Sequence, residues 1–88
     1  MIGTHPNRPS LNPELVRVGA TIREMRQMCG LTQEDLARAA LISRPYLANI
    51  ESGRSKPSRR AVARIAAALH VPQISIIAAP DDTAGCAA

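Results

Sequence analysis

The chain has 88 residues, with 11 basic and 7 acidic side chains and a formal net charge of +4. This length allows one small domain, and with one Tyr and no Phe or Trp the core must be built from aliphatic side chains, which favours packed helices over a sheet. No segment approaches the ~20 apolar residues that cross a bilayer, and the first residues lack the apolar stretch of a signal peptide. We therefore expect a soluble, cytoplasmic, all-α protein that is not associated with a membrane.

Three segments differ in composition. Residues 1–11 and 80–88 have no periodic apolar pattern, so we expect a flexible N-terminal arm and a disordered C-terminal tail. Residues 12–79 then form the single domain. Cys29 and Cys86 have no metal-ligand spacing and are interpreted as reduced thiols, with Cys29 as a small apolar filler at a helix end. No metal and no cofactor is expected.

The first predicted helix lies between Asn12 and Gly30. Asn12 is a favourable N-cap and Pro13 suits the first helical position, while Gly30 is typical of the residue after a helix end. Apolar residues recur within it at spacings of three and four, as expected for one buried face: Leu15, Val18, Ile22, Met25 and Cys29.

Two short helices are predicted next. Thr32 opens the second helix and can exchange hydrogen bonds with Asp35, which is a short-armed capping box. Ser43 caps the third helix, residues 44–51, and Pro45 is tolerated in its first turn because the amide there has no partner inside the helix. The inner face of the second helix consists of Leu36, Ala37 and Ala40.

Two further helices complete the prediction. Ser58 caps a fourth helix that ends near His70, and a fifth, short helix is expected from about Gln73 to Ala78. Its three isoleucines cannot all face one core, so we expect some of them to form a self-association patch; the alternative is that they only close the bundle. They are Ile74, Ile76 and Ile77. The expected fold is a compact bundle of four to five helices.

The second and third helices are the candidate functional unit. Two short helices joined by a tight turn can place one helix in the DNA major groove while the other braces it against the backbone. Ser43 to Arg64 holds six basic residues and one acidic residue, a net charge of +5 that exceeds the charge of the whole chain. Arg59 and Arg60 oppose the dipole at the start of the fourth helix, which indicates either a nearby polyanion or an ordinary solvated face.

Three motifs in order resemble the Cro/repressor (XRE) helix-turn-helix family of phage and bacterial regulators: LTQEDLA at 31–37, SRPYLANIESGR at 43–54 and KPS at 56–58. The resemblance covers about residues 18–77 and implies a lambda repressor-like DNA-binding domain. One position departs from the family. The turn residue that is usually Gly, because φ is positive there, is Leu41. Either Leu41 accepts strain of about 1 kcal/mol or more, or the turn differs and the recognition helix is tilted.

The resemblance also implies which side chains contact DNA. Arg44, Pro45 and Asn49 fall on positions that contact bases: Arg44 can bind guanine bidentately, Asn49 can pair with adenine, and Pro45 can meet a thymine methyl. Alternatives remain open: Arg44 could bind only a phosphate, Asn49 could be a solvated residue, and Pro45 could only stiffen the helix start. Positions expected to contact the DNA backbone are Gln33, Ser43, Tyr46, Arg54, Lys56 and Arg59, although Gln33 could be merely solvated and Ser43 is chiefly a cap.

The resemblance to this family also implies a structural role for Arg26 and Glu51. Arg26 and Glu51 match a family ion pair that ties the first helix to the end of the recognition helix, where a free Glu51 would repel phosphate. Tyr46 is expected at the DNA edge, because Leu47 and Ile50 already define the inner face and a core aromatic would be misplaced there.

The function expected from the resemblance is sequence-specific binding of double-stranded DNA by a transcriptional regulator, a phage or prophage-type repressor or a Cro-like protein. It would bind an inverted repeat as a homodimer, with half-sites about 34 Å apart and with dimerisation that DNA itself can drive. The alternative is an antitoxin that binds a toxin partner and represses its own promoter. An enzyme is not expected, because His5 lies in the arm, His70 lies at a helix end, and no nucleophile motif is present.

Overall fold

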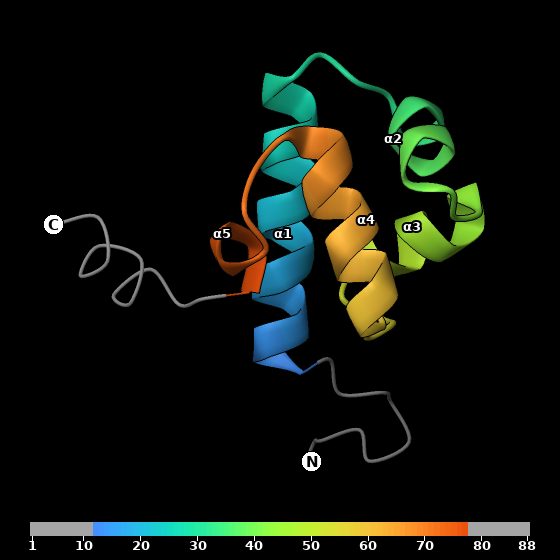
Figure 1. Ribbon diagram of the computed structural model, residues 1–88. Helices are drawn as coiled ribbons and strands as arrows, with labels where there is room; N and C mark the ends of the chain where they lie inside the picture. Colours follow the sequence, from blue (N-terminus) through green and yellow to red (C-terminus); the bar gives the residue numbers. More distant parts are fainter. Residues whose placement is uncertain (1–11, 78–88) are drawn as a thin grey trace, which may run out of the picture.

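A computed structural model describes residues 12–77, which form five helices around one core (Figure 1). The helices are α1 Pro13–Met28, α2 Gln33–Ala40, α3 Arg44–Glu51, α4 Arg59–Leu69 and α5 Ile74–Ile77. The all-α prediction is therefore confirmed. The predicted arm 1–11, the tail 80–88, Cys86 and the predicted end of the fifth helix at Ala78 lie outside the described residues.

The four longer helices begin at the predicted caps. Asn12, Ser43 and Ser58 each accept a hydrogen bond from a backbone N–H two or three residues ahead. Thr32 Oγ1 accepts from the Asp35 N–H at 3.0 Å, and the Thr32 N–H donates to Asp35 Oδ2 at 3.0 Å, which completes the capping box. The hydrogen bond from the Thr32 amide lowers the pKa of the Asp35 carboxyl, and Arg38 adds to the effect.

The turn between α2 and α3 resolves the question raised by Leu41. Leu41 takes the left-handed conformation, with φ 60° and ψ 41°, and the residue is 73% exposed. The turn therefore keeps its positive φ, and Leu41 accepts the strain without burying its side chain in return. His70 adopts the same conformation after α4.

The core lies where α1 packs against α3 and where α2 packs against α4. In Figure 1, α5 lies to the left of α1, and α4, α2 and α3 lie to its right. Gly19 allows the closest approach: a Cβ there would lie 2.3 Å from the Ile50 carbonyl oxygen and 2.6 Å from that of Glu51. The backbone of α1 therefore touches that of α3 near the end of α3. The side chains that are almost completely buried are Ile22, Leu36, Leu47, Ile50, Ile65 and Ile76.

One predicted core position turns out differently, and the isoleucines of α5 agree with the prediction. Cys29 was expected to fill the core at a helix end, but this prediction is wrong, because Cys29 is the exposed C-cap of α1. The chain turns at Gly30, and Leu31 packs against the core at this end instead. Of the three isoleucines in α5, Ile76 is completely buried while the residues Ile74 and Ile77 are 50% and 47% exposed, so not all of them face the core, as predicted.

Candidate nucleic-acid interface

Helix α3 has two faces of opposite character. Leu47, Ile50 and Glu51 are buried, whereas Arg44, Pro45 and Asn49 are exposed. Pro45 and Asn49 are four residues apart and therefore neighbours on the helix surface, and Arg44 precedes Pro45 in the first turn. The structure thus brings the three predicted base-contacting residues together on the solvent side of one helix.

The polar groups on this outer side are available for a ligand. Within residues 12–77, no hydrogen bond or ion pair involves the guanidinium of Arg44 or the side-chain amide of Asn49. Both groups can therefore present their donors and acceptors to a ligand without breaking contacts inside the protein.

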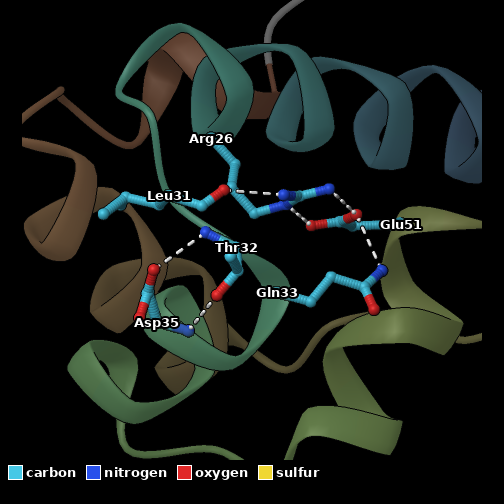
Figure 2. Close-up of polar contacts among 6 residues, drawn as sticks. All are labelled: Arg26, Leu31, Thr32, Gln33, Asp35 and Glu51. Atoms are coloured by element: carbon cyan, nitrogen blue, oxygen red, sulfur yellow. Dashed lines mark hydrogen bonds and ion pairs between the residues drawn. The ribbon is translucent and has the colours of Figure 1, made fainter.

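The opposite end of α3 is held by a buried polar cluster (Figure 2). Arg26 Nε donates to Glu51 Oε2 at 2.8 Å, and Arg26 Nη2 donates to Glu51 Oε1 at 3.2 Å. Arg26 Nη1 also donates to the Leu31 carbonyl at 2.8 Å. The expected ion pair is therefore present, with only 11% of the Arg26 side chain and 3% of the Glu51 side chain exposed. The cluster ties the last turn of α1 to the last turn of α3.

Gln33 joins the same cluster, a contact that the sequence analysis missed. Its Nε2 donates to Glu51 Oε1 at 3.1 Å, although the two residues are 18 positions apart. The side-chain amide has a second N–H, so a phosphate contact by Gln33 stays a prediction. No local pattern could have indicated this bond, because it depends on how α2 and α3 pack.

The position of Tyr46 corrects the sequence interpretation. The expectation that an aromatic side chain would be misplaced in the core is wrong, since Tyr46 is half-buried and packs against the core cluster. Its hydroxyl oxygen accepts a hydrogen bond from the Ser58 N–H at 3.1 Å. Tyr46 therefore links α3 to the cap of α4. The hydroxyl hydrogen can still be donated, so the predicted backbone contact remains a prediction.

Exposed cations surround the end of α3. Arg54 and Lys56 lie in the α3–α4 connection, and Arg59 and Arg60 form the first turn of α4. Glu51, the only acid between residues 43 and 64, is buried against Arg26 and does not neutralise them. This connection therefore carries a positive charge that is suited to a polyanion. The remaining predicted backbone contact, Ser43, is the exposed N-cap of α3.

Membrane-spanning helices and metal-binding clusters are both absent from the residues that the structure describes. From Asn12 to Ile77, no helix combines the length and apolar character needed to span a membrane. The same stretch holds no group of three His, Cys, Asp or Glu side chains that could bind a metal ion.

Comparison with known proteins yields one consistent family. A family model described as a helix-turn-helix domain matches residues 17–75. The chain is 32% identical over 66 residues to an uncharacterized HTH-type transcriptional regulator, y4dJ, of Sinorhizobium fredii, covering 75% of this chain and 86% of that protein. It is 43% identical over 60 residues to the immunity repressor protein of Bacillus phage phi105, covering 68% of this chain and 41% of that protein. The chain spans about half the length, or less, of the phage proteins that it matches.

A solved structure agrees with this result. The restriction-modification controller protein C.AhdI from Aeromonas hydrophila superposes with a TM-score of 0.73 at 31% identity, covering 74% of this chain and 98% of that chain. This match confirms the predicted lambda repressor-like arrangement, and the relatives are regulators rather than enzymes. The chain therefore belongs to the helix-turn-helix domain family of DNA-binding transcriptional regulators.

Proposed function

We propose that this protein is a phage-type transcriptional repressor that recognises a specific double-stranded DNA sequence with α3. One observation carries the proposal: Arg44, Pro45 and Asn49 share the exposed side of a helix whose other side is buried. A helix has room to enter the major groove, where every base pair presents a distinct pattern of donors and acceptors. The name of the phi105 relative, an immunity repressor, supports the repressor role.

The exposed side chains match the chemistry of base edges. The Arg44 guanidinium fits guanine O6 and N7, the Asn49 amide fits adenine N6 and N7, and the Pro45 ring fits a thymine methyl. Each bidentate pair distinguishes the correct base from a wrong one by about 1–3 kcal/mol. Arg44 and Asn49 therefore determine most of the sequence preference.

The backbone contacts supply most of the affinity. We assign them to Gln33, Ser43, Tyr46, Arg54, Lys56 and Arg59. Each phosphate neutralised by a cation releases counterions, so the logarithm of affinity falls by about 0.9 per contact for each unit rise in the logarithm of salt concentration. Loss of Arg54 or Lys56 weakens binding to all duplexes alike.

The protein acts as a homodimer on an inverted repeat, in the cytoplasm. Support comes from Ile74 and Ile77, two large apolar side chains that stay about half exposed beside the buried Ile76. Replacing both Ile74 and Ile77 with Asp gives a monomer in sedimentation experiments and weakens binding to a two-half-site operator far more than binding to one half-site. Unchanged sedimentation of this variant would remove the patch from the dimer interface.

Selection of bound sites from a pool of random duplexes tests the proposal directly. The wild type enriches one sequence at near-physiological salt, and the double variant Arg44→Ala/Asn49→Ala loses the preference while its melting temperature stays within a few degrees of the wild type. Arg44→Lys keeps the positive charge but loses the bidentate hydrogen-bonding geometry of the guanidinium. We therefore expect this variant to lose less affinity for DNA than preference for the selected sequence. Arg38→Ala, an equal loss of charge on α2, leaves the preference unchanged. No enrichment by the wild type, or full preference in the double variant, overturns the proposal.

A further inference from the structure

A polar pocket of about 220 Å³ lies between α1, α2 and α3. The buried Arg26–Glu51 pair lines it, and so do Arg23, Gln33, Ala48 and Ser52. Three helices thus contribute to one small polar depression, and one of them, α1, lies outside the helix-turn-helix unit.

Arg23 is the unpaired cation of this pocket. It is exposed on α1, and among residues 12–77 no carboxylate pairs with it: Glu14 pairs with Arg17, Glu34 with Arg38 and Glu51 with Arg26. The one carboxylate in the pocket, Glu51, is already neutralised by Arg26 and hydrogen-bonded by Gln33. Among the residues that line this pocket, Arg23 is therefore the cation without a paired carboxylate, while its chain neighbour Glu24 lines the adjacent pocket.

The pocket opens beside the proposed DNA-contacting side of α3. Ala48 and Arg44 are four residues apart, and so are Ala48 and Ser52, so all three lie along one line of the helix. In helix-turn-helix proteins the helix before the recognition helix crosses the DNA backbone, so Gln33 at the start of α2, which lines this pocket, would lie next to a backbone strand when α3 is in the major groove.

The position of Arg23 differs from that of the cations after α3. Lys56 lines a separate pocket with Asn12 and Leu15 at the start of α1. Arg23 lies eight residues beyond Leu15, which is about 12 Å along the helix axis at the usual rise per residue. Arg23 and Lys56 therefore lie beside different turns of α1.

We propose that Arg23 is an additional DNA-binding residue, which contacts a backbone phosphate from α1 together with the second side-chain N–H of Gln33. The inference rests on the proposed function, because it requires α3 to lie in the major groove. The contact involves no base, so Arg23 raises affinity and fixes the position of the protein on the duplex without changing the preferred sequence.

Salt-dependent binding tests the proposal with fluorescence anisotropy on the selected operator and on a scrambled duplex. Arg23→Ala weakens binding to both duplexes by the same factor. When the salt concentration is raised from 50 to 200 mM, the fold-loss of affinity is roughly three times smaller for Arg23→Ala than for the wild type, because the variant has one phosphate contact fewer. Arg23→Lys restores most of the salt dependence. Arg38→Ala, which removes another exposed arginine from α2, leaves the salt dependence at the wild-type value.

Neutral methylphosphonate groups placed singly along the operator locate the contact. At one backbone position, the substitution weakens binding of the wild type but not of Arg23→Ala, whereas at all other positions it affects both proteins equally. Wild-type salt dependence in Arg23→Ala, with no coupled backbone position and an intact fold, overturns the role of Arg23 alone. Failure of the wild type to prefer any duplex overturns the proposed function instead.

Discussion

The two sides of α3 differ in how their polar groups are satisfied. On the inner side, Glu51 accepts three hydrogen bonds from Arg26 and Gln33 and is almost completely buried. On the outer side, Arg44 and Asn49 are exposed and make no side-chain hydrogen bond to residues 12–77. Buried polar groups require partners, so the inner cluster fixes the position of the helix, whereas the unpaired outer groups remain available to a ligand.

This contrast separates stability from recognition within one short helix. Substitutions on the inner side are expected to change the free energy of unfolding and to affect DNA binding only as a consequence. Substitutions on the outer side are expected to change binding alone. Substitutions elsewhere in the domain test whether stability and DNA binding can be changed separately.

The largest effect is expected for Glu51→Ala. It leaves the Arg26 guanidinium buried without its partner, so the protein loses about 3–5 kcal/mol of stability and binds its operator more weakly. Thermal unfolding measures the loss. Glu34→Ala, which breaks the exposed pair with Arg38, costs less than about 1 kcal/mol.

A further variant keeps the Glu51 prediction testable if Glu51→Ala does not fold. Replacing both Arg26 and Glu51 with Met removes both charges, and it should recover much of the lost stability. An unchanged melting temperature and operator affinity in Glu51→Ala would show that the ion pair does not hold α3.

The next largest effect is expected at Gly19, where α1 touches the backbone of α3. Gly19→Ala places a methyl group against the carbonyl oxygens of Ile50 and Glu51, so α3 must move and the protein loses about 2 kcal/mol of stability. Chemical denaturation measures the change. Gly30→Ala is the matched control, because its Cβ meets nothing within 4 Å and only its φ of +74° is strained. Equal stability of Gly19→Ala and the wild type would refute the close contact.

A smaller and opposite effect is expected for Leu41→Gly. Glycine adopts φ 60° without steric strain, and little burial is lost at a residue that is 73% exposed, so the variant should gain about 1 kcal/mol of stability. His70→Gly has the same backbone geometry and should gain a similar amount. A Leu41→Gly protein that melts below the wild type would show that the turn is not strained.

The smallest effect is expected at the capping box of α2 and depends on pH. Because the pKa of Asp35 in the folded protein lies below its usual value of 3.8, its carboxylate stabilises the fold fully above that value, and the contribution disappears as the pH falls through the lowered pKa. The difference in melting temperature between the wild type and Asp35→Asn should therefore be present at pH 7 and vanish on acidification. Thr32→Ala, which removes the cap itself, should remain less stable than the wild type at every pH.

Much of the fold could be predicted because its signals are local. Asn12, Thr32, Ser43 and Ser58 bond to amides two or three residues ahead, so they marked the helix starts without knowledge of the fold. The motif residues also identified the family, and with it the Arg26–Glu51 pair. The DNA contacts assigned to Arg44, Pro45 and Asn49 stay predictions.

Three features of the site could not be predicted. They are the packing of Tyr46 against the core, the hydrogen bond from Gln33 to Glu51, and the close approach of α1 to α3 at Gly19. Tyr46 bonds to Ser58, 12 residues away, and Gln33 bonds to Glu51, 18 residues away. Residues separated by 12 or 18 positions along the chain form no periodic pattern that would reveal such a contact.

The sequence by itself determined where the helices begin, which face of each is apolar and where positive charge gathers, because caps, periodicity and composition act over a few neighbouring residues. Only the tertiary structure decided that Leu41 adopts the left-handed turn, that Glu51 is buried among residues from three segments, and that Arg23 lies beside α3. These outcomes depend on how close the helices approach one another, and that distance is set by side chains far apart in the chain.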